Sequence, residues 1–125
     1  MLVTRFNAGI DIEEVGRFKK LDVKKNRHFF ELIYTPREIE YCLSKPNPHS
    51  HFAARFAGKE AIIKVIRGWG GNANPGEIEI LNDKNGMPVV NIRSKKIRDI
   101  KIIVSLSHCS DKALAFAWGA LDGSC

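Results

Sequence analysis

A short run in the middle of the chain carries a carboxylate and an ammonium group one helical turn apart. The run is Arg55-Phe56-Ala57-Gly58-Lys59-Glu60-Ala61-Ile62-Ile63-Lys64. In a helix, Glu60 and Lys64 lie on one face, above small alanine residues. The commonest explanation of such a pair is a salt bridge worth about 0.2–0.5 kcal/mol. On a segment otherwise rich in Ala, Phe and Ile, however, charges demand partners, and a metal ion with a phosphate would supply them.

Other residues near this run offer related chemistry. Arg55 and Lys59 add basic groups one turn earlier, and their simplest interpretation is a solvated stripe. Asp11 ends a predicted strand in Gly9-Ile10-Asp11-Ile12. Taken alone, Asp11 is most simply the N-cap of a following helix. Its alternative role is that of a fixed oxygen ligand for a hard cation such as Mg²⁺.

His108 follows an apolar strand, and the simplest interpretation is a histidine at the edge of the core. Ser107 and His108 are adjacent and face opposite sides of a strand, so a hydrolase triad is not predicted. Asn85-Gly86-Met87-Pro88 indicates a turn. Arg17 lies in a basic stretch that is either a solvated helix face or a surface for an acidic partner.

Composition and charge exclude several classes of protein. With 125 residues, 44% of them hydrophobic, we predict one globular domain spanning residues 1–125. No segment is long and apolar enough for a membrane span, and no signal peptide is evident, so a cytoplasmic protein is expected. The net charge of +6 favours anionic partners. Three widely spaced cysteines, Cys42, Cys109 and Cys125, suggest neither a disulfide framework nor a zinc site.

The periodicity of apolar residues predicts an α+β fold, with an N-terminal strand and helices packed on an antiparallel sheet. Thr35-Pro36-Arg37-Glu38 forms a capping box with proline at the first helical position, and Gly68 is a natural helix end. Leu114, Phe116 and Trp118 share one face of a strand, as core residues would. The predicted elements are a strand at 5–12, helices at 13–21, 28–33, 36–43 and 50–67, and strands at 77–81, 88–92, 100–106 and 113–118.

Four of these fragments, in this order and spacing, resemble the holo-acyl-carrier-protein synthase family of 4′-phosphopantetheinyl transferases, in its short single-domain branch. They are Gly9-Ile10-Asp11-Ile12 with Arg17, the run from Arg55 to Lys64, Asn85-Gly86-Met87-Pro88, and Val104-Ser105-Leu106-Ser107-His108. The resemblance implies transfer of the phosphopantetheine arm of coenzyme A to a serine of an apo acyl carrier protein. Adenosine 3′,5′-bisphosphate would be released. Carriers of fatty-acid, polyketide and peptide synthesis all remain open.

The resemblance also implies roles for the charged residues. By similarity, Asp11 and Glu60 hold Mg²⁺ against the pyrophosphate of coenzyme A, and Lys64 neutralises phosphate oxygens and assists the leaving group. A metal and a lysine agree with the positioning and charge neutralisation that phosphoryl transfer requires. The base that deprotonates the carrier serine is left open between Glu60 and a metal-bound water.

The other fragments are expected to bind the rest of the substrates. By similarity, His108, Arg55 and the turn residues Asn85, Gly86 and Pro88 bind the nucleotide end of coenzyme A. Arg17 engages the acidic recognition helix of the carrier protein. Members of the family are typically homotrimers with the nucleotide between neighbours, so one chain would hold part of each site.

The sequence departs from the family in two places. The segment from Lys64 to Gly68 is one residue longer than the usual Lys-Ala-x-Gly, and the loop at 67–72 differs from the usual small polar one. The third acidic metal ligand of the longer branch is not evident, so water would fill that position. The competing functions are a basic nucleic-acid-binding module, whose aromatic residues would alternate with Lys and Arg on a sheet face, and another Mg²⁺-dependent phosphatase or nuclease.

Overall fold

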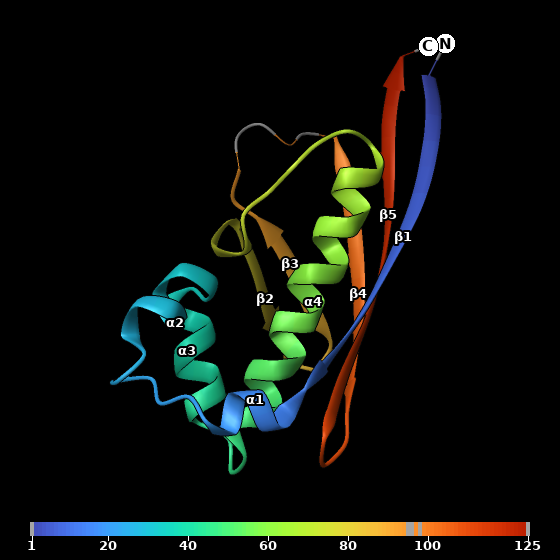
Figure 1. Ribbon diagram of the computed structural model, residues 1–125. Helices are drawn as coiled ribbons and strands as arrows, with labels where there is room; N and C mark the ends of the chain where they lie inside the picture. The colour runs from blue at the N-terminus through green and yellow to red at the C-terminus, as the bar shows by residue number, and fades with distance from the viewer. Residues whose placement is uncertain (1, 95–96, 98, 125) are drawn as a thin grey trace.

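A long central helix lies across one face of a twisted antiparallel sheet in the computed structural model (Figure 1). The structure describes residues 2–94, 97 and 99–124, so Cys125 lies outside the described residues. The strands are β1 (Leu2–Glu14), β2 (Ile78–Asn82), β3 (Pro88–Ile92), β4 (Ile100–His108) and β5 (Lys112–Ser124). The helices are α1 (Val15–Lys19), α2 (Arg27–Ile33), α3 (Pro36–Leu43) and α4 (Pro48–Gly68), with a 3₁₀ turn, η1, at Pro75–Glu77.

The α+β class is confirmed, but the strands form two sheets where one was expected. A three-stranded sheet has the order β1-β5-β4, and β2 and β3 form a separate two-stranded hairpin. All pairings are antiparallel, with Asp11 opposite Ala115 on β5. The first helix is shorter than predicted, because β1 continues to Glu14 and α1 spans only Val15–Lys19. Helix α4 begins at Pro48, two residues before the predicted start, and includes Gly68.

Small side chains let α4 lie close to the sheet. Ala57 and Ala61 on the helix, and Ala115 and Ala117 on β5, are all fully or almost fully buried. At Gly9 the contact is closer still, because a Cβ there would lie 2.2 Å from the carbonyl oxygen of Ala61. This close approach brings β1, which carries Asp11, against the part of α4 that carries Glu60 and Lys64.

The large side chains of the same strands face the other way. Leu114, Phe116 and Trp118 are 40%, 47% and 39% exposed, so the prediction that they belong to the core is wrong for the single chain. Alternation along a strand tells which residues share a face, and here the alanine face, which fits the helix, is the inner one. The opposite side, termed the outer face, consists of Phe6, Ile10, Ile12, Ile103, Leu114, Phe116 and Trp118.

A buried ion pair joins α3, α4 and β2. Thr35 and Glu38 form the predicted capping box at the start of α3. The Glu38 carboxylate also accepts hydrogen bonds from Lys59 Nζ, at 2.7 Å, and from the backbone N–H of Ile80, at 2.9 Å. Lys59 is fully buried and also donates to the carbonyls of Ile33, Pro75 and Ile78, so its interpretation as part of a solvated stripe is wrong.

No helix in the described part of the chain is long and apolar enough to cross a membrane.

Candidate active site

Lys64 of α4 reaches across to β1 and contacts Asp11. Its Nζ donates to the carbonyl of Ile10 at 2.7 Å and lies 3.4 Å from Asp11 Oδ1. This contact stands in place of the Glu60–Lys64 pair that helical spacing alone suggests. Glu60 lies one turn before Lys64 and is half-buried. The structure therefore brings together the three residues predicted for catalysis, from β1 and α4.

The carboxylates of this group are close enough to influence one another. Glu13 shares the strand face of Asp11, since residues two apart on a strand point the same way. Burial raises the pKa of Glu13 to about 7, and the neighbouring carboxylates of Asp11 and Glu60 raise it further. Glu13 was not predicted as a site residue, because the apolar periodicity predicts a helix that begins at this position. Continuing the strand by two residues would have found it.

The donor set fits a hard cation. Asp11 Oδ2 is buried and has no hydrogen-bond partner among the described residues. An unpartnered carboxylate oxygen beside further carboxylates suits Mg²⁺, which proteins commonly hold through one or two carboxylates plus substrate phosphates and water. In residues 2–94, 97 and 99–124, no three His, Cys, Asp or Glu side chains are arranged to hold a metal by themselves. Substrate oxygens or water would thus complete the coordination.

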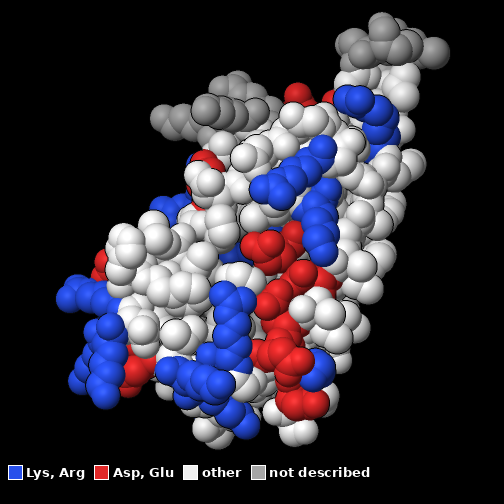
Figure 2. Space-filling model, in the orientation of Figure 1, with Lys and Arg blue, Asp and Glu red and all other residues white. Residues whose placement is uncertain are grey.

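Arg17 lies at the edge of this acidic group. Its guanidinium is 3.4 Å from the Glu13 carboxylate and lies over the Phe56 ring, 5.0 Å from the centroid. Its side chain is 51% exposed. Figure 2 shows basic side chains over the lower part of the molecule, where α1 lies, beside a strip of acidic ones. Arg17 is therefore an exposed positive charge beside the carboxylates.

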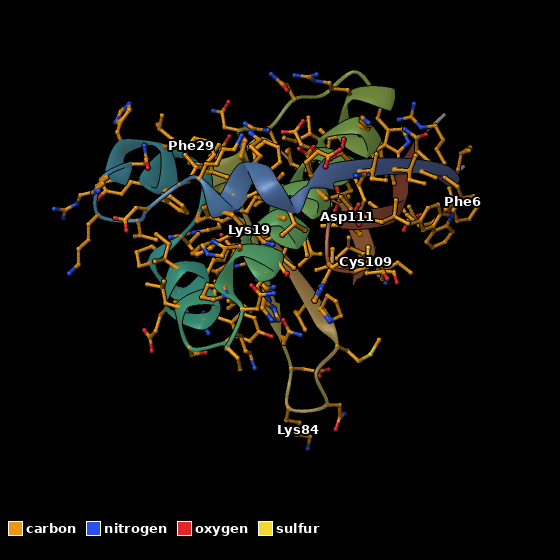
Figure 3. The ribbon with its side chains drawn as sticks, turned by 60° about the horizontal axis from the view of Figure 1, so that its bottom comes forward. Phe6, Lys19, Phe29, Lys84, Cys109 and Asp111 are labelled. Carbon is orange, nitrogen blue, oxygen red and sulfur yellow. The ribbon has the colours of Figure 1, made fainter. Side chains whose placement is uncertain are left out.

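A second group of predicted residues lines a cavity of about 590 Å³ between α4, the β2–β3 hairpin and β4. Arg55, Gly86, Pro88 and His108 all contribute to its walls. The tip of the hairpin projects from the rest of the molecule at Lys84 (Figure 3). The remaining lining residues are Tyr41, His51, Ala54, Asn82, Met87, Ile103, Val104, Ser105 and Leu106.

Arg55 is part of the wall of this cavity and is only 2% exposed, so it is not a solvated residue. Its Nε donates to the carbonyl of Ile80 at 3.1 Å, and its Nη2 donates to Asn82 Oδ1. Asn82 Nδ2 in turn donates to the carbonyl of Gly86 at 2.8 Å. Gly86 has a φ of +80°, which glycine adopts readily. Arg55 thus positions the hairpin turn through Asn82.

One prediction for this cavity needs adjustment, and two residues of its lining were not predicted. Asn85 lies in the turn with its backbone N–H bonded to Asp83 Oδ1 at 2.8 Å, and it is not among the lining residues. Tyr41 and His51 line the cavity but were not predicted as site residues. A signal for His51 was available, since it precedes Arg55 by four residues and therefore shares its face of α4.

The acidic group and the cavity lie on opposite sides of α4. Arg55 and Lys64 are nine residues apart, and at 3.6 residues per turn this separation corresponds to about half a rotation. Asp11, Glu60 and Lys64 are also not among the residues that line the cavity. A single chain therefore brings together each half of the predicted site, but not the two halves.

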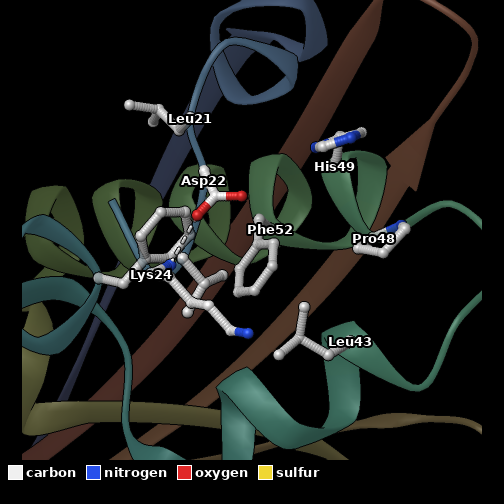
Figure 4. A pocket seen from close by; sticks show the side chains of 9 residues that line it. Leu21, Asp22, Lys24, Leu43, Pro48, His49 and Phe52 are labelled. Atoms are coloured by element: carbon white, nitrogen blue, oxygen red, sulfur yellow. Dashed lines mark hydrogen bonds between the residues drawn. The ribbon is translucent and has the colours of Figure 1, made fainter. Parts of the chain in front are cut away.

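A further cavity, of about 370 Å³, has mostly apolar walls and lies between the segment after α1 and the helices α2, α3 and α4 (Figure 4). Leu21, Leu43 and Phe52 form much of it, and His49 lies at its edge. The Asp22 carboxylate there accepts hydrogen bonds from the backbone N–H groups of Lys24 and Lys25. This cavity brings no predicted site residue to its walls.

Comparisons with known proteins agree on one family. The family model described as the 4′-phosphopantetheinyl transferase superfamily matches residues 7–117. A holo-[acyl-carrier-protein] synthase from Chloroherpeton thalassium is 41% identical, covering 86% of this chain and 92% of that protein. The corresponding protein from Ruminiclostridium cellulolyticum is 44% identical, with 87% of each chain covered. The solved synthase from Bacillus anthracis, in complex with coenzyme A (3′,5′-ADP), is 27% identical with a TM-score of 0.73, covering 91% and 95%.

Proposed function

We propose that this chain, which belongs to the 4′-phosphopantetheinyl transferase superfamily, transfers the phosphopantetheine arm of coenzyme A to a serine of an apo acyl carrier protein. Its curated relatives are holo-[acyl-carrier-protein] synthases. We take residues 1–125 as one transferase domain. The observation that carries the proposal is the contact of Lys64 with Asp11, whose second carboxylate oxygen is buried without a partner.

The residues around Asp11 suit this reaction. The serine oxygen of the carrier attacks the phosphorus that bears the pantetheine arm, and the bond from that phosphorus to the adenosine phosphate breaks. Asp11 and Glu60 would hold Mg²⁺, which supplies neutralisation of the pyrophosphate charge. Lys64 stabilises negative charge on the leaving adenosine 3′,5′-bisphosphate. The serine proton passes to a base, for which Glu60 and a water molecule are the candidates.

The cavity on the other side of α4 would hold the nucleotide end of coenzyme A. Arg55 and His108 bring positive charge or hydrogen-bond donors to it, and Gly86 and Pro88 shape one wall. Asn85 would act through the conformation of the turn. The Bacillus anthracis relative was solved with coenzyme A, which supports a coenzyme A site in this chain.

A homotrimer would join the two halves of the site. The outer face defined above exposes seven large apolar side chains, and Phe6 and Trp118 stack on it with ring centroids 5.2 Å apart. Contiguous apolar surface of this kind is typical of protein interfaces. Its aromatic residues have aliphatic neighbours, whereas a nucleic-acid-binding face would alternate them with Lys and Arg. In the trimer, Asp11 of one protomer would face the cavity of its partner.

The trimer can be tested separately from the chemistry. Sedimentation velocity should give three times the mass of the 14.1 kDa chain. Phe116→Glu, which places a charge in the centre of the outer face, should yield monomers that have lost transfer activity. A native protein that sediments as a monomer and is fully active would contradict the shared site.

The carrier protein would dock beside Arg17. This arginine is exposed and next to the acidic group, so an acidic helix bound there would bring its serine close to the phosphate. Arg17→Ala should raise KM for the carrier several-fold while leaving kcat and KM for coenzyme A almost unchanged. An unchanged KM for the carrier would remove Arg17 from docking.

One assay tests the transfer itself. The protein is mixed with coenzyme A, Mg²⁺ and apo acyl carrier proteins, and the carrier mass is followed for addition of the phosphopantetheine arm. Glu60→Gln should abolish transfer and leave the fold intact, while replacement of Glu14, which pairs with Lys112 on the surface, should not. Release of inorganic phosphate without a change in carrier mass would instead support a phosphatase.

A further inference from the structure

His51 lines the cavity of about 590 Å³ in which we place the nucleotide end of coenzyme A, and the sequence did not predict a role for it. It lies in the first turns of α4, and its ring meets the ring of His108 from β4 edge to face, with centroids 5.3 Å apart. On its other side it contacts the Tyr41 ring of α3 at 5.9 Å. Arg55 follows one helical turn later on the same face of α4. His51 thus lies next to both residues expected to bind the nucleotide, Arg55 and His108.

The cavity has a clear preference in charge. Its lining includes one arginine and two histidines but no aspartate or glutamate. Arg55 is committed to Ile80 and Asn82, so it supplies a fixed positive charge more than a free hydrogen-bond donor. The two imidazoles supply the other nitrogen groups of the lining that can bind an anion. Such a cavity selects an anion, and its affinity depends on the protonation of His51.

We propose that His51 and His108 together bind a terminal phosphomonoester, and that His51 takes up a proton when this group enters the cavity. The proposal rests on the proposed function, since coenzyme A carries such a group, the 3′-phosphate, on its nucleotide end. His51 would then distinguish coenzyme A from its analogue without the 3′-phosphate, dephospho-coenzyme A.

The surroundings of His51 explain why the proton arrives with the ligand. The charged or titratable groups that face it are Tyr41 from α3, Lys45 from the following loop, Arg55 from α4 and His108 from β4. Burial lowers the pKa of His51, and the positive charges of His108, Arg55 and Lys45 lower it further. An empty cavity therefore favours the neutral imidazole. A dianionic phosphate reverses the sign of the local field and favours the imidazolium.

The linkage predicts a measurable pH dependence. Because the phosphate raises the pKa of His51, affinity for coenzyme A should be about 10-fold greater below the pKa of the empty site than above that of the occupied site. Dephospho-coenzyme A lacks the group that causes this change. Its affinity should therefore vary much less between pH 6 and pH 8.

Calorimetric titration tests this proposal. The full-length protein is titrated with coenzyme A and, separately, with dephospho-coenzyme A, each in the presence of Mg²⁺. Titrations in two buffers of different ionisation heat give the number of protons taken up. His51→Gln should lose most of the preference for coenzyme A at pH 6 and take up fewer protons than the native protein. His49→Gln is the matched control, since His49 is two residues away on α4 and lines the other cavity.

A second variant covers the case in which His51→Gln fails to fold, as judged by thermal melting. His51→Arg keeps the positive charge but does not titrate, so it should retain the preference for coenzyme A with a weaker pH dependence. If a folded His51 variant binds coenzyme A with native affinity and native proton uptake, the inference is wrong while the proposed function stands. If the native protein binds neither compound, the proposed function itself fails.

Discussion

The contact between Gly9 and α4 gives the sharpest test of how the fold positions the site. Replacing Gly9 by alanine adds a single methyl group on β1, two residues before Asp11. Gly9 does not have a positive φ, so alanine can adopt its backbone conformation. The added Cβ would lie 2.2 Å from the carbonyl oxygen of Ala61 and 3.1 Å from Cβ of Lys64. The effect of the substitution must therefore come from the close approach alone.

The magnitude follows from these distances. Ordinary contacts of a Cβ begin near 3.4 Å, so the separation from the Ala61 oxygen has to increase from 2.2 Å to that value. Overpacking of this kind costs about 1–3 kcal/mol. For a chain of this length, that cost lowers Tm by roughly 3–12 °C. The same movement carries Lys64 away from Asp11, and a misplacement of about 1 Å at a catalytic site can reduce the rate about 10²-fold.

Two measurements on Gly9→Ala check this reasoning: its thermal unfolding and its initial rate of phosphopantetheine transfer, followed by carrier mass. Gly16→Ala in α1 is the matched control, because a Cβ there has no neighbour within 4 Å. Alanine in a helix is about 0.8–1 kcal/mol more favourable than glycine, so this control should be as stable as the native protein or more so. Native activity and stability in Gly9→Ala would refute the proposed role of the β1–α4 contact.

Two further predictions concern buried polar groups away from the substrate. Lys59→Met leaves the Glu38 carboxylate buried without its partner, so the free energy of unfolding in urea should fall by about 3–5 kcal/mol. The added substitution Glu38→Gln should restore part of this loss. A loss below about 1 kcal/mol would contradict the buried pair. Burial raises the pKa of the Cys42 thiol to about 12, so Cys42 should stay protonated and should not react with iodoacetamide at pH 8. The exposed Cys109 should react. Mass mapping of the peptides checks this, and labelling of Cys42 in the native protein would refute it.

Local sequence signals predicted the helices α2, α3 and α4 and the hairpin well. The capping box at Thr35 and Glu38 is present as expected, and β3 has the predicted bounds, Pro88–Ile92. These features depend on a few neighbouring residues, which is why the sequence reveals them. Leu114, Phe116 and Trp118 of the outer face were wrongly predicted to be buried, for a different reason. Alternation in β5 separates alanines from large residues, but only the tertiary fit of α4 decides which set is buried.

The candidate site was likewise predicted where local signals were enough and missed where tertiary contacts decide. Asp11, Glu60 and Lys64 were selected by type and spacing, and the structure brings them to one place. Glu13 was missed because β1 extends two residues beyond its predicted end, a boundary that its pairing with β5 determines. Lys59 could not be placed from sequence, because its partner Glu38 lies 21 positions away and helical spacing provides no link between them.

Lys59 and Glu60 show how one helix can serve both packing and chemistry. Neighbouring residues in a helix are separated by about 100° of rotation, so fixing one side chain fixes the direction of the next. Lys59 is held by a carboxylate and three backbone carbonyls, from Ile33, Pro75 and Ile78. These contacts oppose rotation of α4 about its axis, while the contact at Gly9 sets its distance from β1. Charges that would cost stability if unpaired thus orient Glu60 and Lys64 toward Asp11.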